Sequence, residues 1–342
     1  MSLELSYYNT AASICGKVYL EIKSKILLDF IENKVEKINI LPLLEYGNNR
    51  IIEETKLIFK KMDNKLKGIA SPVSISLNNC VGNYTFDLFN KYNELNFIKI
   101  DDIIKINLGV SINGCIANLC ETFTVNKNKE ITKIIKFLDN LMYDLEEIIE
   151  PGETNDTIRM MIESKCTEKD VFPIENCKSF EQKECQIKFN DSKYLILNYT
   201  KKYDLDDNLL IEPNLCFEFD KNEVYTIDIS VIPISSECYE KFTYKNINNS
   251  HLYRFNENHY SLKLKSSRDF YNNVKSKHYN YLFDAQEYLK NKFCISECIK
   301  NNILEEYPIT FVTHNKKDIP VITKRFTILV TKDSCKILKY NI

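Results

Sequence analysis

Glycine is scarce in this chain of 342 residues: there are seven glycines, and none lies beyond Gly152. Neither G-x-G-x-x-G nor G-x-x-x-x-G-K-[S/T] occurs, so the chain lacks the glycine-rich loops that cradle phosphates in dinucleotide- and nucleotide-binding proteins. Nucleotide binding through such a loop is therefore disfavoured, and we expect no cofactor.

Long apolar runs and paired cysteines are also missing. No apolar stretch reaches the ~18 residues of a membrane-spanning helix, and the opening MSLELSYYNTAAS lacks the basic and apolar regions of a secretory signal. The twelve cysteines include no C-x-x-C pair, so we expect free, buried thiols in a reducing cytosol. A metal shared by Cys294 and Cys298, on one face of an expected helix, would need two further ligands, and none is evident nearby.

Charge of both signs is present but unevenly placed. The formal net charge is −2, whereas residues 241–300 hold eleven Lys and Arg against five Asp and Glu, a net of +6. The remainder of the chain is therefore acidic. A basic segment on an acidic protein suggests a polyanionic partner. The alternative is an ordinary solvated helix face, which such charge runs commonly are.

The strongest local signal is a hairpin of two strands, 103–110 and 115–125. Apolar residues alternate along the first strand, and the connecting turn, 111–114, ends in Asn-Gly, whose residues tolerate the positive φ of a tight hairpin. Asn107 and Asn118 lie eleven residues apart, one on each strand. A hairpin of this size can bring them together on one face.

Helical and strand periodicities organise the rest of the chain. Helices are expected at residues 5–35, 42–62, 129–149 and 155–166, with three more between 267 and 306. Strands are expected at 67–81, 209–219, 224–232, 260–265, 309–314, 320–331 and 334–340. Residues 171–208 are polar with short strands, and residues 233–260 are loop-like. This order predicts an α+β protein.

Seven stretches carry a family resemblance. They are EETKLIFKK (53–61), KGIA (67–70), SISLNNCV (74–81), the 103–125 hairpin, NEVYTID (222–228), YSLKLKSSR (260–268) and RFTIL (325–329). In this order they resemble the proliferation-associated, ErbB-receptor-binding protein family, non-catalytic relatives of the type 2 methionine aminopeptidases (peptidase family M24-like). The resemblance implies one pita-bread (creatinase/aminopeptidase) domain over residues 1–342, with residues 241–305 as a basic α-helical insert.

The related aminopeptidases hold two divalent metals with two Asp, one His and two Glu, and a bridging water is the nucleophile. The resemblance places these ligands, and a substrate-binding His, at Asn107, Asn118, Phe180 (the His), Asp228, Arg325 and Asn83 (the substrate-binding His). One carboxylate of four survives. Amides are poor ligands for dications and a guanidinium cannot lose its proton, so the resemblance implies a pseudoenzyme without a metal.

Asp228 and Arg325 are expected on neighbouring inner strands at this former metal site. A lone buried charge is costly, so we expect these two to form an ion pair, directly or through one water, with the amides of Asn107 and Asn118 completing the hydrogen bonds. The alternative is that Arg325 turns to solvent and the site closes around Phe180.

Three functions follow from these observations. The resemblance implies a monomeric, inactive protein that binds the large ribosomal subunit near the polypeptide exit tunnel, through rRNA and exit-tunnel proteins. The location expected is cytoplasmic, with the nucleus and nucleolus less secure because a lysine-rich tail typical of the family is missing, and no membrane contact is expected. The alternatives are a metal-free module that binds peptides or proteins in the old cleft and a metallo-aminopeptidase with unusual ligands.

The basic segment supports rRNA contacts independently of the resemblance, because cations bind the phosphate backbone. The candidate rRNA-binding residues are Lys241, Lys245, Arg254, Lys263, Lys265, Arg268, Lys275 and Lys277. Tyrosines interleave with these cations and are candidates for stacking on bases, although packing is their commoner role.

Overall fold

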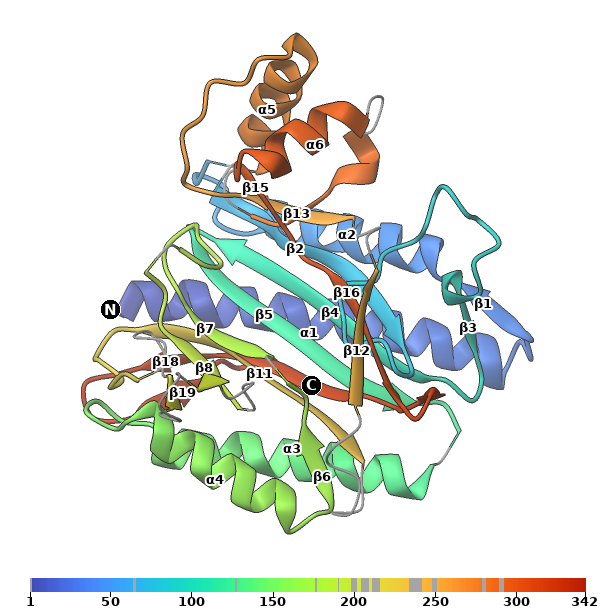
Figure 1. Ribbon diagram of the computed structural model, residues 1–342, viewed down its shortest axis with the longest axis vertical. Coiled ribbons are helices and arrows are strands. Elements are labelled where there is room, and N and C mark those ends of the chain that lie inside the picture. Colours follow the sequence, from blue (N-terminus) through green and yellow to red (C-terminus); the bar gives the residue numbers. More distant parts are fainter. Residues whose placement is uncertain are drawn as a thin grey trace.

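A nine-stranded antiparallel sheet runs through the middle of the protein (Figure 1). The computed structural model describes residues 2–63, 66–126, 128–175, 177–189, 191–197, 202–203, 209–210, 216–233, 242–247, 251–278, 281–288 and 292–342. The strand order is β2-β4-β5-β18-β11-β7-β8, with β19 beside β18 and β6 beside β11. The N-terminal and C-terminal halves of the chain thus contribute adjacent strands, β5 and β18.

The strands of this sheet are β2 Lys67–Leu77, β4 Ile103–Ile112, β5 Cys115–Thr124, β6 Val171–Pro173, β7 Lys178–Gln182, β8 Tyr194–Ile196, β11 Val224–Pro233, β18 Ile322–Val330 and β19 Cys335–Ile337. The helices that pack on it are α1 Ser2–Ile31, α2 Ile40–Leu57, α3 Lys129–Ile148 and α4 Asn155–Thr167. Shorter elements beside them are β1 Lys37–Asn39, β3 Phe97–Lys99, the 3-10 helix η2 Glu94–Asn96, β9 Lys202–Tyr203 and β10 Leu209–Leu210.

The β4–β5 hairpin confirms the strongest sequence signal. Its turn is tighter than expected, because Ile112 already pairs with Cys115 and only Asn113 and Gly114 remain between the strands. Both turn residues have positive φ, 53° and 77°, as a two-residue hairpin of this hand requires. The register sets Asn107 opposite Cys120 and Gly109 opposite Asn118, so both asparagines lie on one face of the sheet.

The opposite face of the sheet is covered by α1, α2 and α3. The apolar residues that α3 buries there are Ile131, Ile134, Leu138, Leu141 and Leu145. Its first turn is capped by Asn128, whose side-chain oxygen accepts from the backbone N–H groups of residues 130 and 131 at 3.1 and 3.2 Å. Burial of these apolar faces forms one core shared by both halves of the chain.

The expected insert has an apolar cluster of its own. Its elements are β13 Leu252–Phe255, α5 Lys265–His278, β14 Phe283–Asp284, the 3-10 helix η5 Ala285–Tyr288, α6 Lys292–Lys300 and β15 Leu304–Glu306. A separate three-stranded sheet links this part to the centre and consists of β12 Phe242–Ile247, β16 Ile309–His314 and β17 Lys317–Asp318. That the whole chain folds as one domain, with no separate unit, stays a prediction.

Three local expectations were wrong. Residues 260–264 form no strand, because the backbone N–H groups of Lys263 and Leu264 donate to the carboxylate of Glu297 instead of to a neighbouring strand. Strands β12 and β13 lie where a loop was expected. Of the expected strand 209–219, only β10 is a strand within the described residues, and 211–215 lie outside them.

The eleven cysteines within the described residues form no disulfide, and Cys294 and Cys298 pack in the apolar cluster of the insert. In the same part of the chain, no helix is both long and apolar enough to cross a bilayer.

Gly16 on α1 allows the last segment of the chain to pack against this helix. A Cβ at this position would lie 1.7 Å from the backbone oxygen of Tyr340, which cannot move aside as a flexible side chain would. The hydroxyl of Tyr340 is fixed in turn, since it donates to Asn118 O at 2.5 Å and accepts from Thr327 N at 2.8 Å.

We expect Gly16→Ala to lower the free energy of unfolding by about 1–3 kcal/mol through overpacking, although alanine favours helix by about 1 kcal/mol. Gly82→Ala is the matched control, because nothing lies within 4 Å of a Cβ there. Urea denaturation measures both. Equal stability of Gly16→Ala and the wild type would show that the terminal segment does not hold this position.

Candidate functional site

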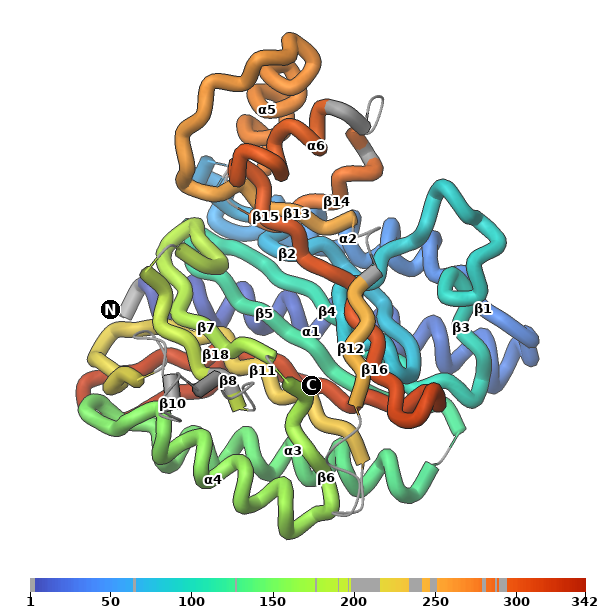
Figure 2. The backbone as a smooth tube through the Cα atoms, viewed as in Figure 1, coloured from blue at the N-terminus to red at the C-terminus, as the bar shows by residue number. Residues whose placement is uncertain are grey.

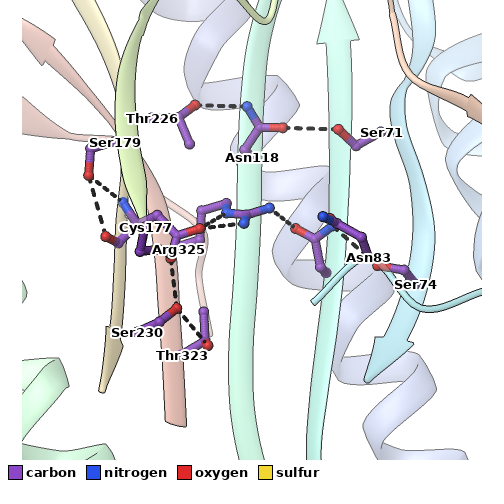
Figure 3. Close-up of polar contacts among 12 residues, drawn as sticks. Ser71, Ser74, Asn83, Asn118, Cys177, Ser179, Thr226, Ser230, Thr323 and Arg325 are labelled. Atoms are coloured by element: carbon purple, nitrogen blue, oxygen red, sulfur yellow. Dashed lines mark hydrogen bonds and ion pairs between the residues drawn. The ribbon is translucent and has the colours of Figure 1, made fainter. Parts of the chain in front are cut away.

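Four side chains lie side by side across the central strands, on the face away from α1 and α3. Figure 3 labels one of the four, Arg325, together with Asn118 and Ser230. Asn107 on β4 pairs with Cys120 on β5, Cys120 pairs with Arg325 on β18, and Arg325 pairs with Asp228 on β11. We call Asn107, Cys120, Arg325 and Asp228 the polar row. Three of its members are positions where the resemblance places metal ligands.

Arg325 joins the two ends of the polar row. Its Nε donates to Asp228 Oδ2 at 2.7 Å, and its Nη2 donates to the same oxygen. Its Nη1 donates to Asn107 Oδ1 at 2.9 Å. The side chain of Asp228 is 4% exposed and that of Arg325 is 23% exposed. The expected direct ion pair is confirmed, and the alternative of an outward Arg325 is wrong.

The second oxygen of Asp228 also has partners. Oδ1 accepts from Ser230 Oγ at 3.0 Å and from Cys177 Sγ at 3.3 Å. Burial, and after it the charge of Asp228, raises the pKa of the Cys177 thiol well above its usual value, so the thiol keeps the proton that it donates. The backbone N–H of Asp228 donates to Ser179 Oγ at 2.9 Å. The carboxylate is therefore both neutralised and hydrogen-bonded.

Asn118 does not join the polar row, which corrects the expectation that both amides would complete the ion pair. Its Nδ2 donates to Thr226 Oγ1 at 2.9 Å and to Gln182 Oε1 at 3.3 Å, and its Oδ1 accepts from Ser71 Oγ at 3.4 Å. The register explains this, because Asn118 lies opposite Gly109, which is two residues further along β4 than Asn107.

Phe180 and Asn83 lie outside the polar row. Phe180 is on β7 opposite Thr226 and packs against an apolar cluster that includes Ile116 and Tyr281. Asn83 follows β2 with a φ of 65°, and its Nδ2 donates to Pro308 O at 3.4 Å. Within the described residues, no group of three or more His, Cys, Asp or Glu side chains is placed to hold a metal ion.

Sequence reasoning missed Cys177, Ser179 and Ser230, which all contact Asp228. A signal for them exists, because Ser230 lies two residues from Asp228 on one strand and therefore on the same face. Cys177 and Ser179 are also two residues apart, but they lie where the chain resembles the family poorly, and the pairing of β7 with β11 could not be read from the sequence.

The candidate rRNA-binding cations differ in their exposure and contacts. Lys263, Lys265 and Lys277 are exposed at or near α5, and Lys245 is exposed on β12. Arg268 Nη1 donates to the carbonyls of residues 262 and 263, and Lys275 Nζ donates to Tyr271 Oη at 2.5 Å. Both therefore also have structural contacts. Lys241 lies outside the described residues.

Arg254 has to be removed from the candidate set. It is 4% exposed, its Nε donates to Glu305 Oε2 at 2.8 Å, and its Nη1 donates to Lys188 O at 2.9 Å. A buried guanidinium that is already paired cannot contact a phosphate from the surface. The strand β13 turns this side chain inward, which the charge pattern alone did not indicate.

The chain is similar to known proteins over most of its length. No family model matches it. It is 26% identical to proliferation-associated protein A of Dictyostelium discoideum over 332 residues, which are 94% of this chain and 78% of that protein. It is also 26% identical to the ErbB-3 binding protein 1 of Solanum tuberosum over 317 residues, 91% of this chain and 76% of that protein.

Over more than nine tenths of its length the chain is therefore similar to members of the proliferation-associated, ErbB-receptor-binding protein family. Solved structures confirm the α+β pita-bread fold. A thermophilic Arx1 matches with a TM-score of 0.75 and 21% identity, covering 98% of this chain and 90% of that one. A methionine aminopeptidase from Thermotoga maritima matches with a TM-score of 0.56 and 9% identity, covering 98% and 96%. At these identities the likeness concerns the fold alone.

We expect Arg325→Ala to lower the free energy of unfolding by about 3 kcal/mol, because it leaves Asp228 buried without its cation. Arg159→Ala is the matched control: Arg159 is 22% exposed, but its partners Asp156 and Glu163 are 51% and 41% exposed, so its loss should cost less than about 1 kcal/mol. Adding Asp228→Asn to Arg325→Ala should recover much of the loss. Denaturant unfolding measures all three, and no recovery would contradict the charge argument.

Lys105 provides a second link between the halves of the chain. This lysine of β4 is 1% exposed, and its Nζ donates to Asn78 O at 2.8 Å and to Val321 O at 3.0 Å. It thus joins the segment after β2 to the segment before β18. Burial lowers the pKa of Lys105 to about 8.

Between pH 8 and its usual pKa of 10.5, Lys105 binds a proton more strongly in the unfolded chain than in the folded one. Its contribution to stability is therefore present above pH 10.5 and is lost as the pH falls towards 8. Lys105→Met removes this titration. We expect the free energy of unfolding of the wild type, relative to Lys105→Met, to rise by about 3 kcal/mol across this window. A constant difference would contradict the lowered pKa.

Proposed function

We propose that this protein is a catalytically inactive relative of the methionine aminopeptidases that binds the large ribosomal subunit near the polypeptide exit, through rRNA and exit-tunnel proteins. The observation that carries the proposal is the Arg325–Asp228 ion pair. It uses the one carboxylate that remains at the former metal site, and a guanidinium beside it repels dications. The function is then expected to lie on the surface of the fold and not at this site.

The exposed cations of the insert support a nucleic-acid partner. Lys263, Lys265 and Lys277 lie in a segment of net charge +6, at the end of the molecule farthest from α3 and α4 in Figure 1. Phosphates bind such cations with release of counterions, which makes the affinity salt-dependent. The family resemblance supports the ribosome as the source of these phosphates. A cytoplasmic location belongs to the same proposal, and microscopy of the tagged protein tests it.

The second candidate is a metal-free module that binds peptides at the former active site. One observation favours it: the side chain of Arg325 is 23% exposed. A peptide carboxylate would suit it. Retention of peptide binding in the full-length protein, and its loss in Arg325→Ala, would support this candidate. Stoichiometric Mn, Co, Zn or Fe in the purified protein would instead indicate a peptidase.

Co-sedimentation with purified large subunits across a salt series tests the ribosomal proposal. If six phosphates are neutralised, log K should fall against log[salt] with a slope of about −4 to −5. The triple variant Lys263→Glu, Lys265→Glu, Lys277→Glu should bind much more weakly and lower the magnitude of the slope by about 2–3. These three are preferred over Arg268 and Lys275, whose side chains donate hydrogen bonds within the insert. Of the three, Lys277 has its Nζ 5.4 Å from the centre of the Tyr288 ring, so the fold of the variant is checked by circular dichroism.

The matched control reverses three exposed lysines on α3, namely Lys129, Lys133 and Lys136. It changes the net charge by the same amount at the opposite end of the molecule (Figure 1). Screening confines charge effects to about 8 Å at physiological salt, so the control should bind nearly as the wild type does. Equal loss in both triple variants would mean that total charge, and not this face, governs binding.

A further inference from the structure

Exposed aromatic rings gather on one loop outside the basic helices. Between β2 and η2, Leu88, Phe89 and Tyr92 are 41%, 59% and 89% exposed, and the exposed Lys91 lies among them. Single exposed apolar residues are common on protein surfaces, but three within five residues form a patch. We call residues 87–93 the aromatic loop. Figure 2 shows it projecting from the edge of the molecule.

Hydrogen bonds within the aromatic loop and to Asn96 hold its backbone. Asp87 Oδ1 accepts from the backbone N–H groups of Phe89 and Asn90, both at 3.0 Å. Asn96 Oδ1 accepts from Asp87 N at 2.9 Å, and Asn96 Nδ2 donates to Asn90 O at 3.0 Å. Because the turn is already ordered, binding to its rings costs little conformational entropy. These contacts also occupy the carboxylate of Asp87 inside the turn.

The aromatic loop is joined to the insert. Leu88 N donates to Gln286 Oε1 at 3.0 Å, and Gln286 Nε2 donates to Phe86 O at 2.8 Å. The ring of Phe89 stacks on that of His251, with centroids 6.5 Å apart and planes 20° apart. A ligand that reaches the insert can therefore contact the aromatic loop as well.

We propose that the aromatic loop binds unpaired bases of RNA, with Tyr92 and Phe89 stacking on the bases and Lys91 beside the phosphates. This rests on the proposed function and extends it from phosphate contacts to single strands. Exposed rings stack on any base that is not in a duplex. Lys91 is the cation of the aromatic loop, and the carboxylate that follows it, Glu94, pairs with Lys99 at 2.8 Å.

The chain has no tryptophan, so Tyr92→Trp introduces a single fluorescent reporter into the full-length protein. The probe is a single-stranded RNA of twelve nucleotides, compared with an abasic oligonucleotide of equal length and charge. We expect the RNA to quench the fluorescence and the abasic strand to leave it unchanged. Tyr143→Trp is the matched control, because Tyr143 is 59% exposed on α3, far from the insert (Figure 1), and should show no quenching.

Binding measurements separate the roles of the three side chains. Tyr92→Ala and Phe89→Ala should each weaken binding of the single strand by about 5- to 100-fold with an unchanged salt slope. Lys91→Ala should instead reduce the magnitude of that slope by about one. Equal quenching of Tyr92→Trp by the abasic strand, or a shallower slope in the ring variants, would overturn the proposal.

Two further outcomes distinguish the proposals from each other. If Tyr92→Ala weakens co-sedimentation with large subunits while RNA alone fails to quench Tyr92→Trp, the loop contacts a protein and the RNA proposal is wrong. If the wild type does not co-sediment with large subunits but RNA quenches Tyr92→Trp, the ribosomal proposal fails and the aromatic loop remains an RNA site.

Discussion

The ion pair between Arg325 and Asp228 determines how the centre of this sheet is built. A sheet whose inner face holds a carboxylate at 4% exposure needs a counter-charge, because an unpaired ion in such surroundings costs several kcal/mol. Arg325 supplies that charge from the neighbouring strand, and its fork extends past Cys120 to Asn107 on β4. One side chain thus connects β18, β11 and β4, so the two halves of the chain are joined by charge as well as by backbone pairing.

Strand β18 carries cations to both faces of the sheet. Arg325 points to the polar row, and its neighbour Lys324 points to the helices, where its Nζ donates to Glu121 Oε1 at 2.6 Å and to Asp139 Oδ1 at 2.7 Å. Alternation along the strand makes this arrangement unavoidable. The first pair fixes β18 to β11, and the second fixes it to β5 and α3. The strand from the C-terminal half is therefore held on each side by an ion pair with low exposure.

Much of this site was predictable because its elements are local or paired by charge. The Asn-Gly turn sets the register of β4 and β5, and this register places Asn107 and Asn118 on one face. The ion pair followed from the cost of leaving either charge alone. The partners of Asn118 were not predictable, because they lie on three other strands, β2, β7 and β11, whose order in the sheet cannot be read from the sequence. Nothing in the sequence around Asn118 or around Thr226 predicts the hydrogen bond between their side chains.

The insert was harder to predict for a different reason. Its charge pattern identifies a basic segment, but charge does not say which cations are buried. Arg254 lies between Tyr253 and Phe255 in the sequence of β13 and pairs with Glu305, fifty-one residues away, so its role depends on a tertiary contact. The alternation in 260–265 resembles a strand, yet the carboxylate of Glu297 takes the N–H groups that a strand would share. In each case the local sequence pattern was misleading because one side chain distant in the sequence, Glu305 or Glu297, makes the deciding contact.

The same electrostatics explain why the polar row does not suit a dication. A glutamate in place of Arg325 would set two carboxylates against each other on adjacent strands with no cation between them, and the amides at 107 and 118 would add no charge to hold a dication. The step at position 325 therefore leaves the buried charge of Asp228 unpaired. The polar row is stable as a set, and a change of function is easier at surfaces such as the aromatic loop, where a substitution costs little stability.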